Sequence, residues 1–304
     1  MKTWCGAISA LVAALAPGEW VQSATPRAEE ASAGGQYVRV SGEDLAWRIQ
    51  TPHLVVDLSK NPGTGHSGQI NTIYAKEASV LLTRDRPTST LHLSPNAAVG
   101  ENWIGINRWN PPAKHHLEQG PGRVRLERQG EMPGVPGLQV TTAYEFFATE
   151  AALLVEESIE AKQEVRVRLL RLCEWSVTDG PANPFTHLAW GDANGKTVVK
   201  RRQGEEVLPL ATAWQAFISE TKRFGFAAVV EHLDLGESPV LRNQATHFAG
   251  LPHYFYRALI IGAGPPLPGV PRGTRYAIRY WLYCFRAEQA ARTGELIEAF
   301  RRRR

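Results

Sequence analysis

Long stretches of this chain alternate between apolar and polar residues. The alternation is cleanest in residues 123–128, 138–146, 152–160, 164–172, 223–230 and 275–284. Successive side chains of a β-strand point to opposite faces, so this period buries one face and leaves the other charged. The pattern predicts roughly fourteen to eighteen strands, enough for two large antiparallel sheets packed face to face.

Other architectures are disfavoured by what the pattern lacks. We find no alternation of strands with helices, which argues against a parallel sheet, and no repeat of fixed period, which argues against a propeller or solenoid. The dipeptide Asn194-Gly195 predicts a tight hairpin. Only residues 287–304 have helical spacing. We therefore expect an all-β, two-sheet antiparallel β-sandwich (a supersandwich) over 37–286, followed by a short C-terminal helix and basic tail over 287–304.

The first residues resemble an export signal. Lys2 is followed by an apolar run from Trp4 to Ala16, which Pro17 and Gly18 end. A charged start, a short apolar run and small residues near a cleavage site are typical of a secretory signal peptide. We expect a signal peptide over 1–23, a Ser-, Ala- and Gly-rich linker over 24–36, and a secreted or periplasmic protein.

The charge and the cysteines limit the possible partners. The net charge of +4 equals the contribution of the four arginines 301–304, which we expect to form a solvated end, so nucleic acid is not an expected partner. After cleavage two cysteines remain, Cys173 and Cys284. They could form one disulfide, although two separate buried thiols fit their apolar strands better. No metal-binding or nucleotide-binding spacing occurs, so no metal and no cofactor are expected. No segment after the signal peptide predicts a membrane span, and the oligomeric state stays open.

Two loop regions concentrate the side chains that bind sugars. Residues 100–116 contain two tryptophans, an arginine and two histidines; the candidates are Trp103, Trp109, Asn107, Arg108, His115 and His116. Indole faces stack on sugar rings, and asparagine and arginine bind hydroxyls or carboxylates. Residues 251–257 contain His253, Tyr254 and Arg257. The structural alternative is a loop held by buried tryptophans and a strand with core tyrosines. His187 is a third candidate, in a loop-rich stretch.

The order of strands and loops in the middle of the chain resembles a known family. A strand with Tyr144 is followed by 155–159, by a strand that ends near Trp175, and by 183–188 with His187. This is similar to galactose-mutarotase-like sandwiches, a fold that polysaccharide lyases share in their sandwich domains. The sequence departs from the mutarotase pattern after His187, where Leu188 stands instead of the family's Tyr-Phe-Asn.

The resemblance implies a carbohydrate partner, and we formulate three hypotheses for the reaction. The first is a polysaccharide lyase that cleaves uronic-acid glycans by β-elimination, which needs a base, an acid and a group that neutralises the carboxylate. His187 or His253 would be the base, Tyr254 the acid, and Arg108 or Asn107 the neutralising group. Trp103 and Trp109, with His115, His116 and Arg257, would bind the sugar. The alternatives are a non-catalytic glycan-binding protein and a sugar epimerase or mutarotase.

Overall fold

The structure, a computed structural model, describes residues 37–304. Within that range it leaves out 60–66, 84–89, 100–101, 107–108, 110, 178–184, 203–204, 210, 237–240, 247–252 and 261–268.

The largest element is a nine-stranded antiparallel sheet that forms one whole layer of the fold. Its order is β15 (Thr197–Arg201), β14 (His187–Asp192), β17 (Thr212–Ser219), β18 (Phe224–Asp234), β22 (Arg275–Arg286), β11 (Ala152–Ala161), β10 (Leu138–Phe147), β9 (Arg123–Glu131) and β8 (Lys114–Gly120). Five of these strands, β9, β10, β11, β18 and β22, are the clearest alternating segments of the sequence. The expectation of half-buried strands is confirmed most clearly in β9, whereas residues 224–229 of β18 are all buried.

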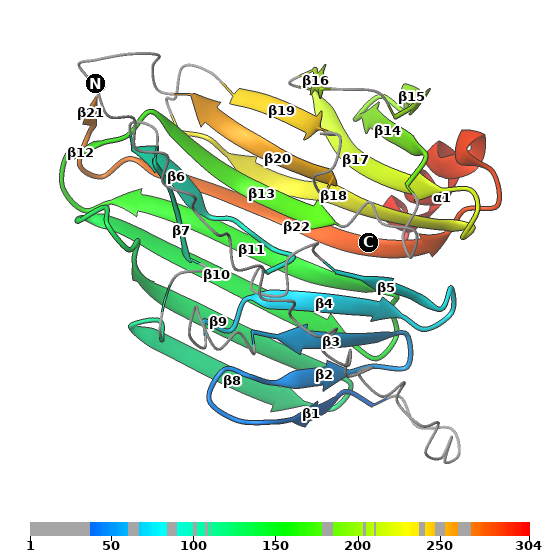
Figure 1. Ribbon diagram of the computed structural model, residues 1–304, viewed down its shortest axis with the longest axis horizontal. Coiled ribbons are helices and arrows are strands. Elements are labelled where there is room, and N and C mark those ends of the chain that lie inside the picture. The colour runs from blue at the N-terminus through cyan, green and yellow to red at the C-terminus, as the bar shows by residue number, and fades with distance from the viewer. Residues whose placement is uncertain are drawn as a thin grey trace, which may run out of the picture. The chain divides into compact units, whose positions relative to one another are not determined.

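The opposite layer consists of two smaller sheets side by side (Figure 1). The five-stranded sheet is β1 (Arg39–Ser41), β2 (Arg48–Gln50), β3 (Leu54–Leu58), β4 (Ile70–Ala75) and β5 (Val80–Leu82). The six-stranded sheet is β16 (Glu205–Leu208), β19 (Leu241–Thr246), β20 (His253–Ile260), β13 (Leu169–Val177), β6 (Asn96–Val99) and β7 (Asn102–Gly105). A short pair, β12 (Val165–Arg166) and β21 (Gly269–Val270), lies apart from them.

One hydrophobic core lies between the layers and draws residues from all three large sheets. The two smaller sheets are joined through the segment before β6, where the Leu91 amide donates to Ile70 O and His92 forms a bridge with Trp175. The expected antiparallel sandwich is therefore confirmed, with its second layer made of two sheets rather than one.

A second, smaller core covers part of the outer face of the nine-stranded sheet. Its helix is α1 (Thr293–Arg301), preceded by a 3₁₀ turn (Ala290–Arg292), so the helix is shorter than the expected 287–304. Ile297 and Phe300 of α1 pack among apolar side chains of β11, β17, β18 and β22. Arg304 does not point freely into solvent: its guanidinium stacks over Trp281 and pairs with Glu150. The basic end thus helps to hold the helix on the sheet.

The structure also tests the expectations for single turns, strands and cysteines. Asn194-Gly195 lies in the turn that joins β14 to β15, as expected, but this turn is longer than a two-residue hairpin loop. The Asp192 amide donates to Lys196 O at 3.1 Å, and of the two residues only Gly195 has a positive φ, +82°. The alternating stretch 164–172 is divided between β12 and β13. Cys173 and Cys284 are two separate buried thiols, as the favoured alternative expected. Of the described helices, none combines the length and apolar character that crossing a membrane takes.

Candidate functional site

The uncovered part of the outer face of the nine-stranded sheet carries a row of polar side chains in register. His116, Glu127, Ala143, Glu156, Arg279 and His232 are successive cross-strand partners from β8 to β18. Neighbouring strands lie roughly 4.8 Å apart, so the row extends about 24 Å across six strands. A bulge between Val230 and His232 leaves both Glu231 and His232 exposed at its end.

Small side chains beside this row hollow the sheet surface. Thr141, Ser158 and Ala277 form the next cross-strand set, and Ala143 stands beside Thr141 on the same face. Long side chains stand around them, and the result is a cleft of about 230 Å³ lined by Arg125, Glu127, Thr141, Ala143, Glu156, Ser158, His232, Arg275, Ala277 and Arg279. Glu157 and Ile278 also border the cleft, but both residues are buried. The cleft exists because the strands place their shortest side chains together.

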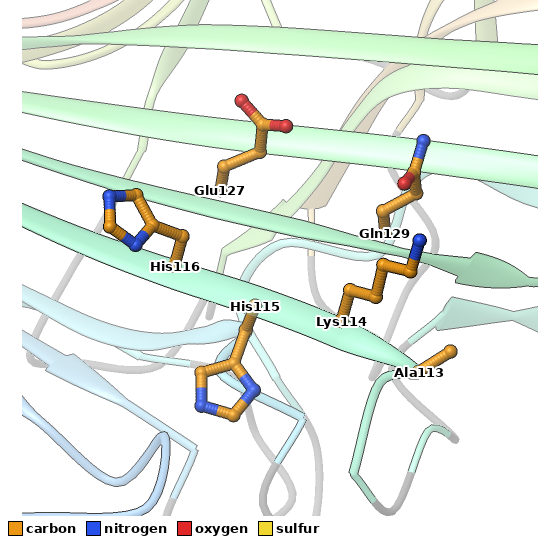
Figure 2. A pocket seen from close by; sticks show the side chains of 6 residues that line it. All are labelled: Ala113, Lys114, His115, His116, Glu127 and Gln129. Atoms are coloured by element: carbon orange, nitrogen blue, oxygen red, sulfur yellow. The ribbon is translucent and has the colours of Figure 1, made fainter.

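A second cleft, of about 580 Å³, adjoins the first at Glu127. Its lining is Ala113, Lys114, His115, His116, Glu127 and Gln129. Figure 2 shows His116 and Lys114 on β8 alongside Glu127 and Gln129 on β9, while His115 points away from them. The His115 ring instead lies 6.0 Å from that of Trp47. We call the two clefts together the charged groove.

Ion pairs fix the carboxylates of the charged groove. Arg125 binds Glu156 at 2.7 Å and Glu127 at 3.5 Å, and Arg279 lies 3.6 Å from Glu156. Arg279 also reaches Glu231 at 3.1 Å. Burial alone would lower the pKa of Arg125, but the hydrogen bond and charge of Glu156 outweigh it and raise the pKa. Each carboxylate that lines the groove on this face is therefore held by a guanidinium.

Of the predicted site residues, the structure brings His115 and His116 to the groove. Trp109 is elsewhere: it is 5% exposed, belongs to the hydrophobic core, and donates its indole N–H to Glu131 O at 2.8 Å. Trp103 lies in β7 as a residue of the six-stranded sheet, and its side chain is outside the described part of the chain. Asn107 and Arg108 also lie outside the described residues.

The other predicted residues do not meet the groove. His187 is on β14, where it contacts Thr186 Oγ1 at 2.9 Å and Glu220 at 3.7 Å. The sheet register places it level with Phe285, which is six residues along β22 from Arg279. His187 is three strands away from β22, so it lies about 20 Å along the strands and about 14 Å across the sheet from Arg279. His253, Tyr254 and Arg257 are on β20, in the opposite layer, and their side chains are outside the description. Their predicted catalytic association stays a prediction.

A second polar cluster is sealed in the core beneath the groove. It joins Glu157, His92, Tyr280, Tyr144 and Arg128, all within 1% exposure. Glu157 accepts from Tyr280 Oη at 2.6 Å, from His92 Nε2 at 2.9 Å and from the Cys173 amide at 3.0 Å. Tyr144 donates to His92 Nδ1 at 2.6 Å and accepts from Arg128 at 2.8 Å.

The environment of this cluster sets its protonation. Burial, only partly opposed by Glu157, holds the pKa of His92 below its usual value, so the imidazole is neutral and its single N–H points to Glu157. Burial alone would raise the pKa of Glu157, but its hydrogen bonds and the His92 interaction outweigh this and lower it. Burial also raises the pKa of Tyr280. The cluster links the layers, and its burial keeps it from contact with a ligand.

Sequence reasoning missed most of the groove. It treated the charges of β9, β11 and β22 as a solvated face. The sequence does contain one sign of the groove: the small polar residues Thr141 and Ser158 have charged residues close by in the chain. These residues can be recognised as one surface only when the register of the strands is known.

No protein-family model matches the chain, and no curated protein matches it. Solved structures do match. Alpha-N-acetylgalactosaminidase NagBb from Bifidobacterium bifidum is 11% identical with a TM-score of 0.53; the match covers 84% of this chain and 38% of NagBb. Galactose 1-epimerase from Lactobacillus acidophilus is 7% identical with a TM-score of 0.47, over 83% of this chain and 98% of the epimerase. A galactose mutarotase-like protein from Clostridium acetobutylicum is 7% identical with a TM-score of 0.46, over 83% and 99%. The likeness to NagBb, of which this chain spans less than half the length, shows a shared β-sandwich fold.

Proposed function

We propose that this protein binds carbohydrate in the charged groove. The observation that carries the proposal is the arrangement of hydroxyl side chains (Thr141, Ser158) on the floor and charged side chains at the rim of an open cleft on a rigid sheet. Sugars present many hydroxyls to a protein, and such a surface offers both donors and acceptors at fixed positions. Support also comes from NagBb, a protein of similar fold whose name refers to a sugar substrate.

The test is a binding titration against a panel of oligosaccharides, with a variant that fills the cleft. Ser158→Tyr places a ring over the floor and should abolish binding. Leu81→Tyr is the control, because Leu81 is an exposed strand residue of the five-stranded sheet, away from the groove. Unchanged binding by Ser158→Tyr, with both variants folded, would reject the groove as the binding site.

A second candidate function is the interconversion of sugar anomers. The specific observation is that His116 and Glu127, cross-strand partners, both line one cleft. An imidazole and a carboxylate are suited to act as the acid and base that sugar ring opening needs. Polarimetry on freshly dissolved aldoses tests it: a faster approach to equilibrium that Glu127→Gln removes would support it. Saturable binding without turnover would exclude anomer interconversion and support only the binding function.

The lyase hypothesis remains a prediction that rests on His187, His253, Tyr254, Asn107 and Arg108. Four of these have side chains outside the described part of the chain, and His187 lies apart from the groove. The measurement is the ultraviolet absorbance of a new C=C bond during incubation with uronic-acid polysaccharides. We also propose that the protein is exported, on the basis of residues 1–23.

A further inference from the structure

The balance of charges in the groove indicates which carbohydrate it takes. The carboxylates that line it on the outer face, Glu127 and Glu156, are both paired with Arg125. By contrast, Lys114 in one cleft and Arg275 in the other have no ion-pair partner among the described residues. The charge left without a partner along the groove is therefore positive at both ends.

Arg275 stands where a ligand could reach it. It is exposed, it lines the cleft beside Ser158 and Ala277, and its cross-strand neighbour is Glu160. Glu160 is bound instead to Lys162 at 2.6 Å. The nearby Asp234 does not line the cleft, and its Oδ1 accepts the Gly236 amide at 3.1 Å. Neither Glu160 nor Asp234 therefore forms an ion pair with the Arg275 guanidinium.

The groove also has little capacity for the contacts that neutral sugars use. Histidines are the only rings among the described residues that line the two clefts. Stacking on an indole or phenol ring is the usual source of affinity for an uncharged sugar face. In its absence the strongest available interaction is a charge-assisted hydrogen bond from a guanidinium or ammonium group, which needs an anionic acceptor.

We propose that the groove binds an anionic glycan, one whose sugars carry carboxylate or sulfate groups, with Arg275 and Lys114 as the two anion-binding side chains. The inference rests on the proposed function and narrows its ligand class. Arg275 would bind the acidic group while Thr141 and Ser158 bind hydroxyls of the same sugar. Lys114, several strands away, would bind a second acidic group, so an oligosaccharide should bind better than a single sugar.

The experiment compares three oligosaccharides of equal length by calorimetry: an oligogalacturonate, a sulfated oligosaccharide and a neutral galacto-oligosaccharide. The anionic ligands should bind at least about tenfold more tightly than the neutral one. Their affinity should fall as salt is raised from about 50 to about 300 mM, because salt screens exposed charges. Comparison of the first two ligands distinguishes a carboxylate from a sulfate as the preferred group.

Matched arginine variants locate the effect. Arg275→Ala should weaken anionic binding about tenfold, and by more than it weakens binding of the neutral oligosaccharide. Arg272→Ala is the control, because Arg272 is also exposed but lies in the turn before β22 and lines neither cleft. Equal affinity for neutral and anionic ligands, or equal effects of the two variants, overturns the inference. Neutral binding that is as tight as anionic binding and that Ser158→Tyr abolishes would overturn the inference while the proposed function stands, whereas no binding of any glycan overturns both.

Discussion

The buried carboxylate of Glu157 should stabilise the fold far more than its exposed neighbour Glu156. Both side chains make close polar contacts, but Glu157 is fully buried whereas the side chain of Glu156 is 34% exposed. The two residues are adjacent on β11, so substitution of each by glutamine changes the same strand and the same chemical group. The difference between the two variants therefore measures how burial of the carboxylate affects the free energy of unfolding.

The magnitude follows from the contacts of Glu157. Its two oxygens accept three hydrogen bonds, from Tyr280, His92 and the Cys173 amide. Glutamine keeps one acceptor oxygen and turns an N–H₂ group toward at least one donor. It also removes the negative charge that offsets the buried guanidinium of Arg128. Removal of one partner from a buried charge pair costs about 3–5 kcal/mol, so Glu157→Gln should lose that amount. Glu156→Gln should lose about 1 kcal/mol or less, as exposed ion pairs do.

The assay is urea unfolding followed by tryptophan fluorescence, which the buried Trp175 and Trp214 make sensitive to packing. Linear extrapolation gives the free energy of unfolding for each variant. A loss of about 3–5 kcal/mol is a large part of the roughly 5–15 kcal/mol of a typical domain. If the two variants differed by less than about 1 kcal/mol, the reasoning that the Glu157 cluster holds the layers together would be refuted.

Three further predictions concern His92, the thiols and the N-terminus. The free energy of unfolding should fall as pH drops below 6.5, by at most about 1.4 kcal/mol per pH unit. The cause is that His92 binds a proton in the unfolded chain but stays neutral when buried, and His92→Gln should flatten a plot of unfolding free energy against pH in that range. Burial raises the pKa of Cys284 to about 12, and Cys173 is also buried, so neither thiol should react with a disulfide reagent until the protein is denatured; rapid reaction of the native protein would contradict this. N-terminal sequencing of exported protein should find a start near residue 24, and a mature chain that still begins at Met1 would exclude cleavage.

The sequence was sufficient to predict much of the nine-stranded sheet, because several of its strands alternate between apolar and polar residues. The strands β9, β10, β11 and β22 alternate wherever one face lies in the core and the other lies outside. In β18, residues 224–229 are buried on both faces, because the second core covers the outer one. The sequence was less sufficient for the second layer, where short strands such as β5 and β6 carry too few residues for a period to be visible.

The site was harder to predict than the sheet. Their place in loop-rich stretches of the sequence drew attention to Trp109 and His187. However, Trp109 is buried in the core, and His187 lies far from the groove. The groove is instead built from common residues, Thr141, Ser158, Glu127 and Arg279, that are far apart in the chain. Register brings them together, and register depends on long-range pairing that no local pattern encodes. Only His115 and His116 were identified beforehand, and they were expected in a loop over 100–116, whereas the structure places them in β8.

The division of each strand between two faces has a consequence for how the protein can evolve. On β11, odd positions such as Glu157 and Ile159 maintain the interior, while even positions such as Glu156 and Ser158 meet whatever occupies the surface. Replacement of Glu156 or Ser158, unlike that of Leu154 in the second core, leaves the interior contacts of its neighbours unchanged. Ligand preference can therefore drift through many substitutions at little thermodynamic cost, and homologues with the same interior residues could recognise quite different molecules.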